Sequence, residues 1–250
     1  MKRVKLIVAY DGTNYRGWQV QPNGVTIESI LNEALSDLLQ EPVAVIGASR
    51  TDSGVHALGN IAVFDTEHRM PADRICIALN QRLPEDIRVQ SSEEVAADWH
   101  PRKCRSTKIY EYRIQNSRIE MPTERLYSHF CYFPLSVEAM REAAQYLIGE
   151  HDFKSFCSVN TQALSTVRTI YSLTVEKQDN IVRIRISGGG FLYNMVRIIA
   201  GTLIEVGRGF YPPVQVASIL AARDRQMAGP TAVAKGLTLI GIEPESIEKT

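Results

Sequence analysis

The chain has 250 residues, of which 44% are hydrophobic and 22% are charged. These proportions are typical of a globular protein and exclude the disordered and fibrous classes. The 28 basic residues balance the 28 acidic residues, which excludes a chain that binds nucleic acid through a large net positive charge. Any contact with RNA must therefore be made by a local group of cations.

Targeting, membrane and metal signals are missing from the sequence. The most apolar stretch, 195–204, is too short to span a membrane and is interrupted by Arg197 and Gly201. The first residues pass from a charged start directly into a strand pattern, without the apolar stretch of a signal peptide. The cysteines form no C-x-x-C pair; they are Cys76, Cys104, Cys131 and Cys157. We therefore expect a cytoplasmic protein with free thiols, no membrane contact and no metal.

The first hundred residues predict the element order β-α-β-β-α-β. Thr26 is a suitable N-cap for a helix over 27–39, which Pro42 ends, and Pro71 starts a second helix. Short strands are expected around both helices and on either side of a polar loop, 49–60; they cover 4–10, 43–46, 61–64 and 87–89. This order is that of the split βαβ, or ferredoxin-like, motif.

The remaining residues predict a second, larger copy of the same pattern. In the expected strand 108–115, Tyr110 and Tyr112 share one face. The other expected elements are helices over 137–148, 191–206 and near 220–222, and strands over 167–176, 181–186 and 237–242. We therefore predict an α+β fold with two ferredoxin-like halves, residues 1–105 and 106–250, whose mixed, mostly antiparallel sheets flank a central cleft.

The loop 47–57 holds a carboxylate, a guanidinium and an imidazole within a few residues, as functional loops often do. It is equally compatible with a polar turn in which Asp52 caps neighbouring amides and Gly54 supplies a positive φ. For His56 we expect a structural role with backbone partners, because no second metal ligand lies at a suitable spacing.

Arg197 lies on the narrow polar stripe of the apolar helix predicted over 191–206. A buried guanidinium requires a partner, and Asp52 is one candidate. If the two pair, the cation lowers the pKa of Asp52 and keeps it an ionised nucleophile. The alternative is that Arg197 binds Glu205 or a carbonyl at the helix end.

Together, four ordered segments resemble the tRNA pseudouridine synthase A family. A further segment, 220–224 with 234–237, resembles the C-terminal pattern of that family, whereas 116–134 matches nothing that we can align. The four segments are Tyr10-Asp11-Gly12-Thr13-Asn14-Tyr15-Arg16-Gly17-Trp18-Gln19-Val20-Gln21, Arg50-Thr51-Asp52-Ser53-Gly54-Val55-His56-Ala57, Lys108-Ile109-Tyr110-Glu111-Tyr112 and Phe191-Leu192-Tyr193-Asn194-Met195-Val196-Arg197.

The resemblance implies an isomerase that needs no cofactor and converts uridine to pseudouridine in tRNA. Asp52 would be its nucleophile, and Tyr110 would contact the uracil flipped out of the stack. Arg50 would contact the RNA backbone or fill the space left by the base, and Arg102, Lys103 and Arg105 could hold phosphates. The implied substrate is the anticodon arm, at nucleotide positions 38, 39 and 40, and the implied assembly is a homodimer.

Two other functions are compatible with parts of the pattern. A non-catalytic RNA-binding module is the main alternative, because ferredoxin-like sheets with exposed aromatic residues bind single strands. A retaining glycosidase would also use a carboxylate nucleophile, but it requires a second acid close to Asp52, and none is apparent. Turnover of uridine in tRNA would distinguish the enzyme from the binding module.

Overall fold

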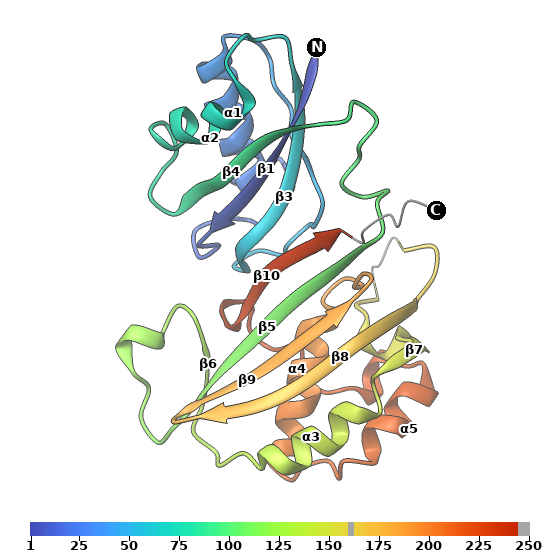
Figure 1. Ribbon diagram of the computed structural model, residues 1–250. Helices are drawn as coiled ribbons and strands as arrows, with labels where there is room; N and C mark the ends of the chain where they lie inside the picture. The colour runs from blue at the N-terminus through green and yellow to red at the C-terminus, as the bar shows by residue number, and fades with distance from the viewer. Residues whose placement is uncertain (160–162, 245–250) are drawn as a thin grey trace. The chain divides into compact units, whose positions relative to one another are not determined.

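The computed structural model describes residues 1–159 and 163–244 and shows an α+β fold with mixed, mostly antiparallel strands. The chain forms two compact units (Figure 1). Unit 1 contains Met1–Ser106 and the C-terminal stretch from Leu239, and unit 2 contains Thr107–Thr238. The division at 106/107 is one residue from the expected boundary, but the C-terminal strand belongs largely to unit 1 and not to the second half.

Unit 1 is a sheet covered on one face by its two helices (Figure 1). Strand β1 lies between β4 and β3 and is antiparallel to both, β2 pairs with β3, and β10 also neighbours β3. Alternate residues of β1 are buried, from Val4 to Tyr10, which is the pattern of a sheet with one covered face. The elements are β1 (Lys2–Tyr10), α1 (Ile27–Leu39), β2 (Ile46–Gly47), β3 (His56–Thr66), α2 (Ala72–Asn80), β4 (Ile87–Val95) and β10 (Leu237–Pro244).

Unit 2 has the strand order β5-β9-β8-β7, antiparallel throughout, with the short β6 parallel to β5. Helices α3, α4 and α5 lie together on one side of this sheet (Figure 1). The elements are β5 (Ser106–Asn116), η1 (Pro122–Glu124), β6 (His129–Cys131), α3 (Val137–Gln145), β7 (Gly149–Asp152), η2 (Lys154–Phe156), β8 (Val167–Gln178), β9 (Ile181–Gly188), α4 (Met195–Gly207), α5 (Gln215–Ala222), η3 (Arg225–Met227) and η4 (Ala234–Gly236).

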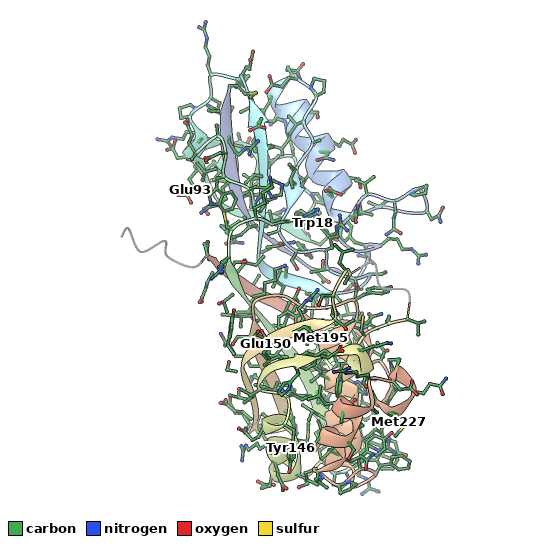
Figure 2. All side chains as sticks on the ribbon, turned by 90° about the vertical axis from the view of Figure 1, so that its right-hand side faces the viewer. Trp18, Glu93, Tyr146, Glu150, Met195 and Met227 are labelled. Atoms are coloured by element: carbon green, nitrogen blue, oxygen red, sulfur yellow. The ribbon has the colours of Figure 1, made fainter. Side chains whose placement is uncertain are left out.

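Each unit has a large buried side chain that marks its core. Figure 2 labels Trp18 in unit 1 and Met195, the first residue of α4, in unit 2. Trp18 is fully buried, and Met195 is 1% exposed. Of the thirteen residues of α4, eleven are buried, so α4 forms the centre of the unit 2 core, as its apolar sequence predicts.

Most predicted elements are confirmed, including α1 with its Thr26 cap and the strand around Tyr110. The strand predicted over 43–46 is displaced along the chain, because β2 covers Ile46–Gly47. The amides of Val43 and Val45 donate to Ser36 Oγ and Asn32 Oδ1 of α1, so they are not available to a neighbouring strand. The loop predicted over 49–60 is shorter, because β3 already begins at His56.

Helix α4 begins at Met195 and not at residue 191 as predicted. Asn194 has φ 60° and ψ 7°, in the left-handed region, and such a residue cannot continue a right-handed helix. All four cysteines are free, as expected. Within the described ranges, no helix is long and apolar enough to cross a membrane.

Candidate active site

Asp52 lies in the short connection between β2 and β3, where its side chain is half-buried. The amide of Val55 donates to the Asp52 carbonyl at 3.1 Å and closes a turn. Gly54, inside this turn, has φ 76°, which confirms the predicted positive φ. The backbone around Asp52 therefore has the compact form expected of a tight turn.

Both neighbours of Asp52 are tied to the segment that follows β1. The Thr51 carbonyl accepts from the amide of Trp18 at 3.0 Å. The Thr51 hydroxyl lies 2.7 Å from the Tyr10 hydroxyl. On the other side, the Ser53 hydroxyl donates to the Tyr15 carbonyl at 3.2 Å. The carboxylate is thus attached to backbone that is held on both sides, which is what a preorganised catalytic group requires.

Two glycines allow this segment to approach the Asp52 loop so closely. A Cβ atom on Gly12 would lie 2.1 Å from the Val55 carbonyl oxygen. Gly17 has φ 86°, and a Cβ atom there would lie 2.6 Å from the Thr51 carbonyl oxygen. These contacts give a structural reason for the glycines in the segment 10–21.

His56 has the structural role that the sequence predicts. Its ring is buried, and its Nδ1 atom lies 3.1 Å from the Gly12 amide, which donates to it. The same Nδ1 atom lies 3.1 Å from Asp11 Oδ1. Across 1–159 and 163–244, no cluster of His, Cys, Asp and Glu could hold a metal ion.

Arg50 is exposed, two residues before Asp52. Arg102, also on the surface, donates through Nε to the Gly47 carbonyl at 2.7 Å. Burial of its inner part and the nearby Arg50 cation lower the pKa of Arg102. Two cations are therefore close together beside the Asp52 loop, an arrangement that suits an anion such as a phosphate.

In unit 2, Arg197 lies in the first turn of α4 and is half-buried. Its Nε atom donates to the Ala232 carbonyl and its Nη1 atom donates to Asn194 Oδ1, both at 2.8 Å. Glu205, one of the predicted alternatives, pairs with Arg208 at 2.9 Å. A backbone carbonyl does accept from Arg197, but it belongs to residue 232 and not to the helix end.

The segment that supplies this carbonyl, residues 230–236, is itself fixed against α4. The Ala232 amide donates back to the Arg197 carbonyl at 3.1 Å. A Cβ atom on Gly201 would lie 1.8 Å from the Pro230 carbonyl oxygen, so only glycine lets the segment lie this close to the helix. Arg197 and the 230–236 segment therefore hold each other in place.

The two tyrosines of β5 are both buried. Tyr110 is 7% exposed and meets the Phe191 ring edge-on, with centroids 5.3 Å apart and planes at 90°. Tyr112 is fully buried. Its hydroxyl donates to the Val233 carbonyl at 2.9 Å and lies 3.0 Å from His129 Nδ1. Burial raises the pKa of Tyr112, although the Arg197 cation opposes this rise.

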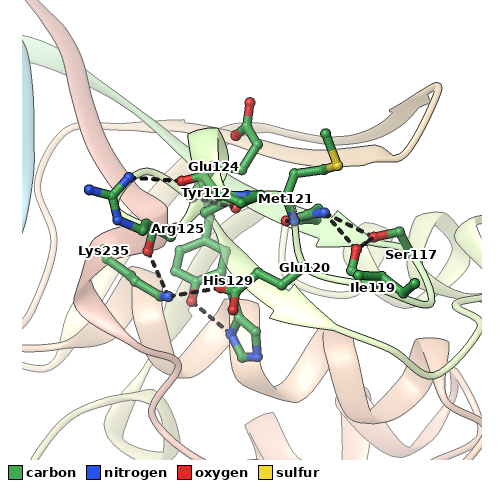
Figure 3. A network of polar contacts seen from close by, with 12 residues as sticks. Tyr112, Ser117, Ile119, Glu120, Met121, Glu124, Arg125, His129 and Lys235 are labelled. Carbon is green, nitrogen blue, oxygen red and sulfur yellow. Dashed lines mark hydrogen bonds and ion pairs between the residues drawn. The ribbon is translucent and has the colours of Figure 1, made fainter.

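The region 116–134, for which the sequence predicts nothing, is fixed to β5 and to the 230–236 segment (Figure 3). Arg113 of β5 pairs with Glu124 at 3.1 Å. Lys235 donates to the Arg125 carbonyl at 2.8 Å and pairs with Glu120 at 3.5 Å. This network therefore supports the same segment that holds Arg197.

Asn194 is the residue of this site whose contacts the sequence analysis missed. In the sequence it stands out only as a member of the segment 191–197. A signal does exist, because Asn is the residue other than glycine that best tolerates the left-handed region, and it follows the flexible run Gly188-Gly189-Gly190. Its partners, however, are visible only in three dimensions.

A family model described as tRNA pseudouridine synthase matches residues 6–102 and 143–243. The chain therefore belongs to the tRNA pseudouridine synthase family. The matched ranges include Arg50, Asp52 and Arg197, whereas Tyr110 lies between them. The first of these ranges lies within unit 1, and the second includes α4 and the 230–236 segment of unit 2.

The curated relatives have a narrower name, tRNA pseudouridine synthase A. One, from Thermoanaerobacter sp. (strain X514), is 47% identical over 242 residues, which cover 97% of this chain and 99% of the relative. Another, from Brevibacillus brevis, is 47% identical over 239 residues, which cover 96% of this chain and 98% of the relative. A third, from Exiguobacterium sp. (strain ATCC BAA-1283 / AT1b), is 46% identical over 248 residues, which cover 99% of this chain and 100% of the relative.

Proposed function

We propose that this chain isomerises uridine to pseudouridine in tRNA, with Asp52 as the nucleophile. In this reaction the bond between N1 of uracil and C1′ of ribose breaks, and a bond between C5 and C1′ forms. The hydrogen on C5 leaves and N1 gains a proton, so the conversion is redox-neutral and calls for no cofactor. The observation that best supports the proposal is the family match across both units, together with the fixed loop around Asp52.

Arg197 is proposed as the cationic partner of the Asp52 carboxylate. A carboxylate acts as a nucleophile only in its ionised form, and an adjacent guanidinium favours that form. The two bonds to Ala232 and Asn194 support this role, because they fix the guanidinium without altering its charge. A guanidinium has five N–H donors, so two such bonds are compatible with binding a carboxylate as well.

Tyr110 and Arg50 are proposed as contacts of the RNA substrate. A base that reacts must leave the stack, and an aromatic ring can then stack on it. The edge-on contact with Phe191 would hold the Tyr110 ring in one orientation. The exposure of Arg50 and its closeness to Arg102 support a contact with the RNA backbone.

The finer details of substrate and assembly are also proposals. We propose that the substrate is the anticodon arm, at nucleotide positions 38, 39 and 40, and that the protein acts in the cytoplasm as a homodimer. The proposed architecture is two ferredoxin-like halves flanking a cleft. The element order of unit 1, β1-α1-β2-β3-α2-β4, supports the ferredoxin-like assignment of that unit.

The function can be tested with unmodified tRNA labelled with tritium at C5 of uridine. The wild-type protein should release tritium, and mass-based mapping should place the new pseudouridines at positions 38, 39 and 40. Asp52→Asn should lower turnover by at least about 10³-fold, as loss of a nucleophile does, while tRNA still binds. Asp73→Asn, an exposed carboxylate in α2, is the matched control and should remain fully active.

The same experiment distinguishes the two functional classes. Binding of tRNA without release of tritium from the wild-type protein would show an RNA-binding module and refute the enzyme. Full activity of Asp52→Asn would leave the enzyme assignment intact but remove Asp52 from the role of nucleophile. Release of tritium with the new pseudouridines at other positions would refute only the anticodon-arm assignment.

A further inference from the structure

The Asn194 side chain is used in an unusual way for a residue at the start of a helix. An asparagine at this position normally accepts a hydrogen bond from a backbone amide of the first turn. Asn194 is the N-cap of α4, but its side chain makes no such bond. Instead, its amide nitrogen donates to Ser158 Oγ at 2.8 Å and its amide oxygen accepts from Arg197 Nη1 at 2.8 Å. The side chain is therefore a bridge between two side chains and not a helix cap.

This bridge fixes the plane of the Arg197 guanidinium. A planar group is held in orientation when two of its atoms are bound, and here Nε is bound by the Ala232 carbonyl and Nη1 by Asn194. Asn194 in turn is restrained by Ser158, whose amide donates to the neighbouring Tyr193 carbonyl at 3.2 Å. The left-handed backbone of Asn194, with φ 60°, turns the chain into the helix at this point.

The chemical type of the side chain is as important as its position. An amide oxygen accepts a hydrogen bond and has no net charge. A carboxylate in the same place would form an ion pair with Arg197 and would weaken the attraction of Arg197 for any other anion. Asparagine therefore orients the guanidinium without neutralising its positive charge.

We propose that Asn194 is a positioning residue for the isomerisation, and that its amide oxygen holds the Arg197 guanidinium in the orientation that binds the Asp52 carboxylate. This inference rests on the proposed function, because it assumes that Asp52 and Arg197 act together. It assigns a role in catalysis to a residue that touches neither the uracil nor the ribose.

The most informative variant is Asn194→Asp, which keeps the shape of the side chain and adds one negative charge. We expect kcat to fall by about 10- to 100-fold, as the loss of a partner that orients a functional group typically causes, while KM for tRNA changes by less than about threefold. The acid limb of the kcat profile should move to higher pH, because a weakened Arg197 cation favours the ionised Asp52 carboxylate less. A residue with a purely structural role would not move this limb.

A second variant keeps the experiment informative if the carboxylate disturbs folding. Asn194→Gly retains the left-handed backbone, which glycine adopts readily, and removes the amide. We expect kcat to fall by about 10-fold, as a small misplacement of a catalytic group causes, with the circular dichroism spectrum and tRNA affinity of the wild type.

Unit 2 offers matched controls at the β8–β9 hairpin. Gln178 Oε1 accepts from Arg183 Nη1 at 3.1 Å, so Gln178→Glu repeats the change from amide to carboxylate beside another arginine. Asp179 has φ 53°, so Asp179→Gly repeats the placement of glycine in a left-handed position. Both variants should keep the kcat and the pH profile of the wild type.

The outcomes separate this inference from the function on which it rests. If Asn194→Asp has the kcat and acid limb of an active wild type, the positioning role is refuted and the proposed function stands. It is also refuted if kcat, tRNA affinity and melting temperature fall together while the acid limb stays in place, because that result indicates a structural role. If the wild type forms no pseudouridine, the proposed function fails, and the positioning role fails with it.

Discussion

At the scale of single residues, the proposed nucleophile must satisfy two conditions: the carboxylate must stay ionised and it must stay in place. The loop around Asp52 meets the second condition through Thr51 and Ser53, which are bonded to the segment after β1. The first condition depends on a cation. Because Arg197 is held by two neutral oxygens, its charge is retained, and it can serve as that cation.

The role of Arg197 can be tested by removing its charge and keeping most of its apolar bulk. We expect Arg197→Met to lower kcat by about 10²-fold or more and to weaken tRNA binding by less than about threefold, because the charge is proposed to act on the Asp52 carboxylate and not on the RNA. Single-turnover tritium release gives the first value and filter binding gives the second. Arg208→Met, at the other end of α4 where Arg208 pairs with Glu205, is the control. Equal losses of catalysis and binding in Arg197→Met would contradict the expected role.

Residue types and spacing indicate Asp52 and Arg197 as candidates, because a carboxylate in a dense polar loop and an arginine on an apolar helix are both visible in the sequence. They leave a polar turn equally compatible with the loop, and only the family resemblance implies a nucleophile there. The contacts of Asn194 were not predictable. They depend on a positive φ and on Ser158, which lies 36 residues earlier in the chain. Sequence patterns report local periodicity, whereas such pairs are determined by packing.

At the scale of elements, periodicity predicted the helices and long strands and failed where side chains replaced backbone partners. The strand predicted over 43–46 begins only at Ile46, as β2, because α1 side chains bind the amides of Val43 and Val45. The helix predicted from residue 191 begins four residues later, at Met195, because Asn194 is left-handed. In both cases the apolar pattern was present, and a hydrogen bond or a backbone angle determined where the element begins.

The network around the 230–236 segment makes the stability of unit 2 depend on pH. The Tyr112 hydroxyl donates its one proton to the Val233 carbonyl, so His129 Nδ1 must donate to that hydroxyl (Figure 3). Burial and the Lys235 cation lower the pKa of His129 below its ordinary value of 6.5. The unfolded chain therefore binds more protons than the folded protein between these two pKa values.

From this difference we expect the free energy of unfolding to fall as pH drops from 6.5 toward the folded pKa of His129, and to be little affected by this group above pH 6.5. Urea unfolding at pH 7.5 and pH 5.5 measures the effect. His129→Asn keeps a donor near the position of Nδ1 but does not titrate, so the difference between the two pH values should shrink. An unchanged difference in this variant would show that His129 is not responsible.

At the scale of the whole molecule, the chain combines a net charge of zero with a polyanionic substrate. A protein without net charge lacks long-range attraction for RNA, so its electrostatic contribution to binding must come from local cations. The Asp52 loop brings two such cations together, Arg50 and Arg102. The effect of a single arginine on the salt dependence of binding should therefore be measurable.

The salt dependence of tRNA binding therefore tests how Arg50 acts. The logarithm of the association constant should fall linearly with the logarithm of salt concentration, by about 0.7 to 0.9 for each phosphate contact. If Arg50 binds a phosphate, Arg50→Gln should reduce this slope by the contribution of about one phosphate contact. It should also weaken the binding of all tRNAs to the same extent. Arg82→Gln, which removes an arginine that pairs with Asp37, should leave the slope unchanged. If instead Arg50→Gln lowers kcat at an unchanged slope, the residue fills the space of the flipped base, and the phosphate contact is refuted.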